Sequence, residues 1–373
     1  MLPKKLHKKL ENRKTSNSFR QLGEPNNLID FSSNDYLGFS KSESIFKRTH
    51  DYLIDNNSIQ NGSTGSRLLS GNNTLYSSVE TQICNYHQSE AALVFNSGYN
   101  ANLGLLSCVP QRGDLIIYDE LCHASIRDGI QMSNAKGYKF KHNDLEDLAS
   151  HLERSRELSS DNDIYVITES VFSMDGDTPD LNRLIQLSES YNVHLIIDEA
   201  HAIGVFGQGL VSGSIFARVI TFGKALGCHG AAILGSKDLI DYLINFSRPF
   251  IYTTALSPHE LATIKSAYEA LENSKNVEEL HQNILFFNKE IERLKLSDAF
   301  IKSTSAIHCC IISGNDKVKQ LSLQLKDKGF DVKPILSPTV PKEKERLRLC
   351  LHSYNSQEEI SEVLSLIATF VNS

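Results

Sequence analysis

Five short runs of consecutive apolar residues recur along the chain, each followed by a polar or glycine-rich loop and then by a helical pattern. The runs are continuous rather than alternating, which is typical of strands buried on both faces of a sheet. Their alternation with helical segments predicts an α/β fold with a mostly parallel sheet. The runs cover residues 91–95, 115–118, 164–168, 193–197 and 219–222.

The pattern changes after residue 256. Long helical patterns cover residues 260–271, 277–294 and 318–328. Two further apolar segments, 306–312 and 346–351, read as strands, and the second alternates strictly between arginine and leucine from residue 346 to residue 349. Such alternation is typical of a sheet with one face in the core and one face in water. Arg346 and Arg348 share one face, where they are either solvated or project toward a carboxylate. This part of the chain therefore predicts a smaller α+β domain.

The N-terminal segment predicts a helical arm. Leu6 and Leu10 are spaced by one helical turn among lysines, and we expect this helix to be a solvated arm packed on the body of the chain, with a membrane-surface helix as the alternative. Residues 28–30 predict a short strand joining arm and body. The predicted domains are an arm (1–40), a large domain (41–255) and a small C-terminal domain (256–373).

Composition narrows the class of protein. The 373 residues are 40% hydrophobic and 22% charged, as in ordinary soluble domains, and the formal net charge of −7 provides no basic field for nucleic acid. The seven cysteines form no C-x-x-C pair, which indicates free thiols and a reducing, cytoplasmic compartment. No apolar run reaches the ~18 residues of a membrane helix, so we expect no membrane partner.

Reactive side chains follow each of the five predicted strands. In open α/β sheets ligands bind beyond the carboxyl ends of the strands, so these segments are expected to form one site. It would combine a lysine, an aspartate, two histidines, hydroxyls and a glycine-containing loop that opens a helix and suits a phosphate. The segments are 96–102, 120–125, 169–177, 198–201 and Lys224.

Lys224 lies in the stretch TFGKALG, among small residues, directly after the fifth predicted strand. A lysine beside an aspartate and a phosphate-binding loop indicates pyridoxal phosphate, because lysine forms a Schiff base with its aldehyde and a carboxylate keeps the pyridine nitrogen protonated. We expect Gly223, Ala225 and Gly227 to leave room for this cofactor. Taken alone, His123 could be structural, and residues 173–177 could be a turn or a loose cation loop.

The sequence DEAH at residues 198–201 raises the alternative of a nucleotide-driven helicase. That class requires a G-x-x-x-x-G-K-[ST] loop. Before Gly223 and Lys224, the position of the first glycine holds Arg218, and Ala225 stands where serine or threonine is required. The helicase interpretation is therefore disfavoured.

Over nearly its whole length the chain resembles the α-oxoamine synthases, which are fold-type I pyridoxal phosphate enzymes. The resemblance implies a large domain with a mostly parallel sheet, a smaller C-terminal domain and a homodimer with shared active sites. Its motifs are FSSNDYLGFS, GSTGSRLLSG, SGYNAN, HASIRDG, TESVFSMDGD, IDEAHAIGVFG, TFGKALG, IYTTALSP and PTVPKEKERLRLCLH.

Residue by residue, the resemblance implies a Schiff base on Lys224 and a pairing of Asp198 with the pyridine nitrogen. His123 would stack on the ring, and Ser173 and His201 would bind the ring's phenolic oxygen. The phosphate region would be held by Gly98, Tyr99 and Thr221, with Thr253 or Thr254 from the partner subunit. The residues that match substrate-facing positions are Arg20, Asn34, Thr339 and Arg348, with His123 at the reacting face.

The resemblance also implies the reaction class. Members of the biotin pathway condense L-alanine with a pimeloyl thioester, on coenzyme A or acyl carrier protein, and release carbon dioxide. Glycine C-acetyltransferase and serine palmitoyltransferase would share every cofactor residue, and a non-catalytic partner subunit would be expected to lack the lysine. Leu336 stands where some biotin-pathway members have arginine, so the contact to the substrate carboxylate stays open.

Overall fold

The computed structural model describes residues 2–24, 26–158, 162–213 and 215–372. Contacts divide the chain into two compact units. Unit 1 comprises residues 1–36, 173–177 and 278–373, and unit 2 comprises residues 37–172 and 178–277. Unit 1 thus combines the two ends of the chain, whereas each predicted domain is a single continuous segment. The predicted domain limits therefore stay a prediction.

Unit 2 is built on a seven-stranded sheet with the order β2-β8-β7-β6-β5-β3-β4. Neighbouring strands from β7 to β4 are parallel, and β8 is antiparallel to both β2 and β7. All strands except β8 therefore run in one direction, which confirms the predicted mostly parallel sheet. The strands are β2 (Ala91–Phe95), β3 (Leu115–Asp119), β4 (Lys136–Phe140), β5 (Ile164–Glu169), β6 (His194–Asp198), β7 (Ala217–Thr221) and β8 (Ala231–Gly235).

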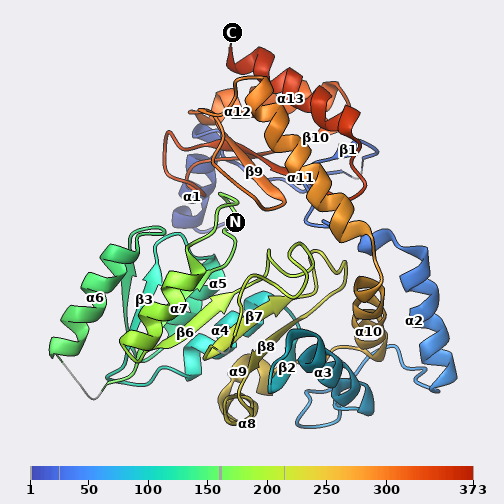
Figure 1. The fold of residues 1–373 in the computed structure, drawn as a ribbon, viewed down its shortest axis with the longest axis vertical. Helices are drawn as coiled ribbons and strands as arrows, with labels where there is room; N and C mark the ends of the chain where they lie inside the picture. Colours follow the sequence, from blue (N-terminus) through green and yellow to red (C-terminus); the bar gives the residue numbers. More distant parts are fainter. Residues whose placement is uncertain (1, 25, 159–161, 214, 373) are drawn as a thin grey trace. The chain divides into compact units, whose positions relative to one another are not determined.

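Helices cover both faces of this sheet (Figure 1). One core layer joins the sheet to α4, α5, α8 and α9, and the opposite layer joins it to α6 and α7. The helices of unit 2 are α2 (Glu43–Asp55), α3 (Thr74–His87), α4 (Gly98–Cys108), α5 (Ala124–Met132), α6 (Leu145–Leu158), α7 (Leu181–Ser190), α8 (Lys237–Phe246), α9 (Arg248–Ile251) and α10 (Pro258–Glu272), with the short 3₁₀ helix η1 (Phe39–Lys41).

Adjacent residues of one strand serve opposite faces of the sheet. Ile196 packs in the layer with α4 and α5, and Ile197 packs in the layer with α6 and α7. A strand that is covered on both sides needs apolar residues at every position, and burying each such side chain contributes about 1.5–3 kcal/mol. This requirement explains why the central strands appear in the sequence as continuous apolar runs.

Two strands of the sheet were not predicted. β4 lies at the sheet edge, and four of its five residues are exposed, so it lacks an apolar run. β8 is apolar, but it follows the end of β7 after only nine residues without an intervening helix. The short connection makes β8 antiparallel, because a parallel neighbour requires a longer crossover.

Unit 1 contains a three-stranded antiparallel sheet with the order β11-β12-β9, and β1 pairs with β10. The predicted strand at residues 28–30 is confirmed as β1. The elements are α1 (Lys4–Thr15), β1 (Ile29–Asp30), α11 (Asn276–Arg293), β9 (Ile307–Ile311), α12 (Asn315–Asp327), β10 (Phe330–Asp331), β11 (Lys333–Ile335), β12 (Arg346–Cys350) and α13 (Gln357–Val371).

The prediction of a wet face on β12 is wrong. All five residues of this strand are buried, and Arg346 and Arg348 are 4% and 9% exposed. Arg346 pairs with Asp175 at 2.5 Å, and Arg348 Nε donates to the Ser173 carbonyl at 2.7 Å. The turn at residues 173–177 thus covers the arginine side of the strand, and since Arg346 takes Asp175, this segment is a structural turn.

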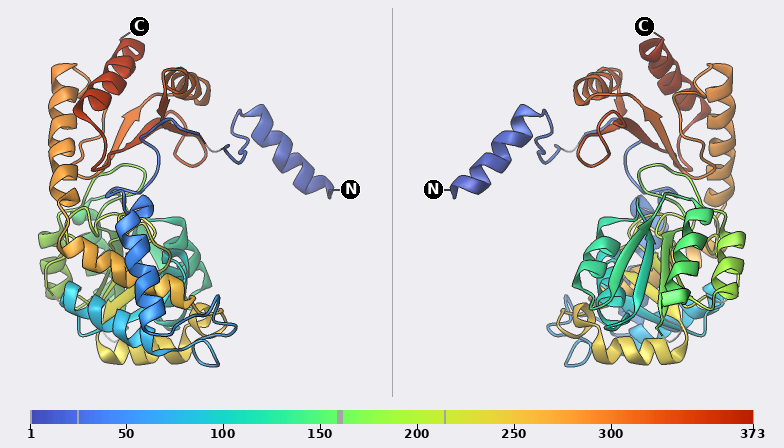
Figure 2. Two further views of the ribbon diagram at one scale, coloured as in Figure 1. Left: turned by 90° about the vertical axis from the view of Figure 1, so that its right-hand side faces the viewer. Right: turned by 90° about the vertical axis from the view of Figure 1, so that its left-hand side faces the viewer.

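The N-terminal helix α1 extends away from the sheet of its own unit (Figure 2) and contains no buried residue. Leu6 and Leu10 are 46% and 44% exposed. The predicted helix is confirmed and is solvated, as expected, while its packing on the body of the chain stays a prediction. Within the described ranges, no helix is long and apolar enough to cross a membrane.

Candidate active site

The site in unit 2 begins at three neighbouring strand ends. β5 ends at Glu169, β6 ends at Asp198 and β7 ends at Thr221, and Glu169 lies directly opposite Asp198 in the parallel register. Glu169 and Asp198 are buried, at 3% and 6% exposure. The parallel strands therefore bring two carboxyl groups to the same edge of the sheet, where buried charge must be balanced by donors.

Lys224 lies just beyond β7 and contacts His201, which lies just beyond β6. The Lys224 Nζ and His201 Nε2 atoms are 2.7 Å apart. His201 is buried and Lys224 is half-buried. The turns after two adjacent strands thus place an amine and an imidazole within reach of proton exchange.

Asn102 holds Asp198 from helix α4. The Asn102 Nδ2 atom donates to Asp198 Oδ2 at 2.7 Å and also to Ser125 Oγ at 3.0 Å, while Asp198 Oδ1 accepts from the Ala200 backbone N–H at 2.9 Å. Asn102 is 2% exposed. The sequence motif SGYNAN contains this residue, but neither it nor Ser125 was assigned a role, because only the fold brings them to Asp198.

His123 is fixed by contacts on its backbone and on its ring. It is the N-cap residue of α5, and its backbone N–H donates to Glu169 Oε1 at 2.6 Å. Its Nδ1 lies 2.8 Å from Ser125 Oγ and accepts from the Ser125 backbone N–H at 3.2 Å. His123 remains exposed, so the rest of its ring is accessible from the site.

Burial shifts the titration of two groups in this cluster. Burial and, to a lesser extent, the Asp198 carboxylate raise the pKa of Glu169 to about 8, and Lys224 opposes the shift. Partial desolvation lowers the pKa of His123, with Asp198 opposing and Lys224 adding to the effect. Glu169 is therefore neutral near pH 7, and His123 is neutral as well.

The start of α4 lies beside the end of β7. Gly98 is the first residue of this helix, and the Ser97 side chain caps it by accepting from the Asn100 backbone N–H at 3.2 Å. A Cβ on Gly98 would lie 3.7 Å from Thr221 Oγ1, which places the helix start beside the end of β7. Backbone N–H groups of a first helical turn favour a phosphate.

Three further residues that were predicted to hold the phosphate, Tyr99, Thr253 and Thr254, are exposed or half-exposed in unit 2. Tyr99 is exposed, and its hydroxyl donates to Asp128 on α5. Thr253 and Thr254 follow α9; Thr254 is exposed, and its carbonyl accepts from Asn96 Nδ2 at 2.8 Å.

The turn after Lys224 requires a glycine at position 227 for its backbone geometry. Gly227 has a φ of +61°, and a Cβ there would lie 2.2 Å from the backbone N of Ser40. Gly227 is required because the turn passes against the backbone before α2. Gly223, by contrast, is exposed with no such contact.

Five residues that were predicted to bind substrate or the ring oxygen lie in unit 1. Arg348 Nη2 donates to Asn34 Oδ1 at 3.0 Å, and its Nε binds the carbonyl of Ser173. Arg20 is exposed, and its Nη2 donates to Thr339 Oγ1 at 3.0 Å. The structure thus brings these residues together as two groups, one buried around Arg348 and one exposed around Arg20.

Glu199, the neighbour of Asp198, has a separate structural role. It is completely buried, and its Oε1 accepts from the backbone N–H groups of Leu210 and Val211 at 2.7 and 3.0 Å. Arg218 Nε donates to its Oε2 at 2.6 Å. The sequence DEAH therefore places one carboxylate toward the site and the next into an internal ion pair.

The sequence matches the family model of aminotransferase class I and II over residues 26–367. The chain belongs to this family.

Within this family, the chain is similar to proteins of known name and to solved structures. It is 38% identical over 371 residues to the 8-amino-7-oxononanoate synthase of Emericella nidulans, covering 93% of this chain and 90% of that protein. The structure of 8-amino-7-oxononanoate synthase from Francisella tularensis matches at 29% identity with a TM-score of 0.77, covering 93% of this chain and 98% of that chain. Sphingomonas wittichii serine palmitoyltransferase matches at 27% identity with a TM-score of 0.80, covering 92% and 87%.

This family member is therefore a pyridoxal phosphate-dependent acyltransferase with the fold-type I architecture. The residues present in unit 2 fit the cofactor. Asp198 suits the pyridine nitrogen, the Lys224 amine suits the aldehyde, and the N-terminus of α4 suits the phosphate. Across the described ranges no group of three or more His, Cys, Asp or Glu side chains could hold a metal ion.

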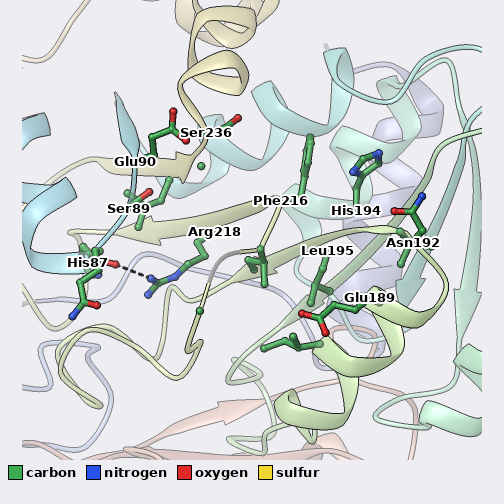
Figure 3. A pocket seen from close by; sticks show the side chains of 18 residues that line it. His87, Ser89, Glu90, Glu189, Asn192, His194, Leu195, Phe216, Arg218 and Ser236 are labelled. Atoms are coloured by element: carbon green, nitrogen blue, oxygen red, sulfur yellow. Dashed lines mark hydrogen bonds between the residues drawn. The ribbon is translucent and has the colours of Figure 1, made fainter.

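A cavity of about 460 Å³ lies at the opposite edge of the sheet (Figure 3). It is lined by residues at the amino ends of β2, β6 and β7, such as Glu90, His194 and Phe216. Arg218 in its wall is bound by Glu199 and by the His87 carbonyl. The carboxyl ends of the parallel strands carry the reactive groups, so this cavity is separate from the candidate active site.

Proposed function

We propose that this enzyme condenses L-alanine with a pimeloyl thioester, carried on coenzyme A or acyl carrier protein, to give 8-amino-7-oxononanoate. In this reaction a bond forms between the alanine Cα and the acyl carbonyl carbon. The thioester C–S bond breaks and the carrier leaves as a thiol, while the bond to the alanine carboxylate breaks and releases carbon dioxide. The observation that carries the proposal is the 38% identity to a synthase of this name over nearly the whole chain.

When bound, pyridoxal phosphate supplies an electron sink at the amino-acid Cα, which permits both proton removal and decarboxylation. We assign the attachment of the cofactor and the removal of the alanine Cα proton to Lys224 Nζ. His201 is in a position to exchange a proton with that amine, since the two nitrogen atoms are 2.7 Å apart. Asp198, buried and held by Asn102, would keep the pyridine nitrogen protonated.

His123 would lie against the ring, and its contacts support that role. Glu169 anchors its backbone and Ser125 anchors its ring, so the imidazole has a fixed orientation at the edge of the site. Ser173 remains the proposed partner of the ring's phenolic oxygen together with His201. Gly98, Tyr99 and Thr221 remain the proposed phosphate-binding residues, with Thr253 or Thr254 from a second copy.

Substrate binding is proposed for Arg20, Asn34, Thr339 and Arg348. A buried guanidinium such as that of Arg348 is a strong partner for a carboxylate, because it presents several N–H donors in one plane. The hydroxyl of Thr339 already accepts from Arg20. Leu336 cannot bind a carboxylate, so Arg20 is the exposed cation among these proposed substrate-binding residues.

Replacement of the lysine tests the proposal. Lys224→Ala should abolish turnover, and borohydride reduction followed by peptide mass spectrometry should find the cofactor on Lys224 in the native enzyme and on no peptide of the variant. Full turnover by the variant would contradict the assignment. The matched control is Lys237→Ala, an exposed lysine on α8 that should retain activity.

A panel of substrates separates the proposed reaction from those of related synthases. Serine palmitoyltransferase is the second candidate, because a structure of that enzyme matches at 27% identity. Carbon dioxide release should be fastest with alanine and a pimeloyl thioester. Preference for serine with a long-chain acyl thioester, or for glycine with acetyl-coenzyme A, would replace the proposed substrates while leaving the cofactor chemistry intact.

A further inference from the structure

Four side chains form a continuous hydrogen-bonded path between the two residues proposed to contact the cofactor ring. It runs from Asp198 Oδ2 to Asn102 Nδ2 (2.7 Å), from Asn102 Nδ2 to Ser125 Oγ (3.0 Å), and from Ser125 Oγ to His123 Nδ1 (2.8 Å). The two central members are 2% and 0% exposed. Water is thus kept from the middle of the path.

The chemistry of the amide determines the direction of these bonds. Asn102 Nδ2 carries two hydrogens, and the path uses one for Asp198 and one for Ser125. The opposite amide orientation would place the Asn102 carbonyl oxygen against the buried carboxylate of Asp198, and two acceptors repel each other at that distance. Asn102 is therefore the donor in both bonds.

The orientation of Asn102 in turn determines the state of His123. Ser125 Oγ accepts from Asn102, so its own hydrogen is available for His123 Nδ1. The backbone N–H of Ser125 points to the same nitrogen at 3.2 Å. Two donors on Nδ1 make this atom an acceptor, which leaves the ring proton on Nε2 and opposes protonation of the imidazole.

We propose that Asn102 and Ser125 are positioning residues that hold His123 as the neutral Nε2–H tautomer and couple it to the charged carboxylate of Asp198. This inference rests on the proposed function, in which these two end residues face the cofactor ring. Neither positioning residue touches the cofactor in this account. Each acts only through the residue it binds.

Asn102→Asp provides the sharpest test, because it preserves size and shape but replaces the donor group with a carboxyl. At pH 8 the introduced carboxylate repels Asp198 and donates nothing, so the Kd for pyridoxal phosphate should rise about tenfold to a hundredfold. As the pH falls the introduced carboxyl takes up a proton and can donate again, so affinity relative to the native enzyme should recover. Asn102→Leu should lose affinity at every pH.

Ser125→Ala tests the His123 end of the path. Loss of the hydroxyl removes one of the two donors that oppose protonation of Nδ1, so the pH midpoint of the bound cofactor's visible absorbance change should differ from that of the native enzyme. Ser133→Ala is the matched control, since this hydroxyl lies at the opposite end of the same helix and binds the Pro110 carbonyl. It should leave the midpoint unchanged.

A buried asparagine elsewhere controls for general loss of stability. Asn283 is 7% exposed and binds the carbonyls of His352 and Asn355 in unit 1. Asn283→Leu should lower the melting temperature but leave the Kd for the cofactor unchanged. Equal cofactor affinity of Asn102→Asp and the native enzyme at pH 8, or a loss that shows no recovery at lower pH, would overturn the proposal.

These measurements use cofactor binding and absorbance, so they do not depend on which acyl donor the enzyme uses. If the native enzyme binds the cofactor but fails to form 8-amino-7-oxononanoate, the proposed reaction fails while the test of Asn102 and Ser125 stands. If the native enzyme forms the product but the Asn102 variants bind cofactor normally, only the positioning role fails.

Discussion

At the residue scale, Glu199 shows how the fold accommodates a fully buried charge. Its carboxylate receives donors from Leu210, Val211 and Arg218, and Arg218 also binds the carbonyls of His87 and Gln208. A buried ion pair with every group satisfied is tolerated, whereas removal of one partner leaves an uncompensated charge. This pair is therefore expected to matter for stability, although it takes no part in the chemistry.

Glu199→Ala should lower the free energy of unfolding by about 3–5 kcal/mol, because it leaves the Arg218 guanidinium buried without its carboxylate. Urea unfolding of the native and variant proteins measures this change. Glu146→Ala removes an exposed partner of Arg183 and should change stability by less than about 1 kcal/mol. Equal effects of the two substitutions would show that the internal pair is not important.

Glu169 makes a prediction about pH. Because its pKa is raised to about 8, the native state keeps a proton that the unfolded chain releases near its ordinary pKa of 4.5. The stability that Glu169 contributes is fully present below pH 4.5 and is lost as the pH rises through about 8. Glu169→Gln retains an oxygen acceptor for the His123 N–H but has no proton to lose.

The stability of Glu169→Gln relative to the native chain should therefore increase between pH 5 and pH 8.5, by on the order of 4 kcal/mol. Urea unfolding of cofactor-free protein at the two pH values measures the difference. A difference that stays constant with pH would mean that Glu169 is ionised in the native state.

At the element scale, β9 carries a buried histidine that the fold does not satisfy. His308 is fully buried against Phe287, with ring centroids 4.4 Å apart, and within the described ranges neither of its ring nitrogens has a hydrogen-bond partner. Burial lowers the pKa of His308 to about 3. The strand therefore holds a neutral imidazole where an apolar side chain would fit the surroundings better.

His308→Leu should stabilise the protein by about 1–2 kcal/mol at pH 7.5, because an unsatisfied polar group is removed from the core. The gain should grow at pH 5 by on the order of 2 kcal/mol. Between pH 6.5 and pH 3 the unfolded chain binds a proton that native His308 does not, so the native chain loses stability as the pH falls.

Urea unfolding at both pH values tests the His308 prediction. His259→Leu, at an exposed position on α10, is the control and should change stability by less than about 0.5 kcal/mol. A His308→Leu protein that is less stable than the native chain at pH 5 would contradict the prediction.

Strand β12 shows why local pattern can mislead about an element's surroundings. Its alternation of leucine and arginine is that of a half-exposed strand. The turn at residues 173–177 returns to this strand and supplies Asp175 and the carbonyl of Ser173 as partners. Buried arginines are possible only where such partners exist, and the sequence of β12 contains no sign of them.

At the scale of the whole molecule, we propose that two copies of the chain associate. Leu6 and Leu10 on α1 are 46% and 44% exposed, and exposed apolar side chains that lie together on a helix can be covered by a second copy. The proposed contribution of Thr253 or Thr254 to a neighbouring site also requires a second copy. The reaction would then depend on association.

Analytical ultracentrifugation should find twice the mass of the chain for the native protein. The double variant Leu6→Glu, Leu10→Glu should dissociate at a concentration at least tenfold higher than the native protein, because charged groups replace apolar contacts. Leu323→Glu changes an exposed leucine on α12 and should leave the mass unchanged. A native protein that sediments as a single chain at all concentrations would refute the dimer.

The sequence by itself determined the central strands and the groups that follow them. Strands covered on both faces need unbroken apolar runs, so β2, β3, β5, β6 and β7 were visible without a structure. Parallel direction then required Asp198, His201 and Lys224 to meet at one edge of the sheet, and the observed contact between Lys224 and His201 agrees with this requirement.

Only the tertiary structure decided which side chains support those groups. Asn102 and Asp198 are 96 positions apart, and the Ser173 carbonyl and Arg348 are 175 positions apart, so no local spacing relates them. The reversal of β8, the burial of β12 and the exposure of α1 likewise depend on what packs beside each element. The periodicity of a sequence shows which faces of an element are apolar and must be buried, but the hydrogen-bond partners of a side chain depend on which elements the fold places beside it.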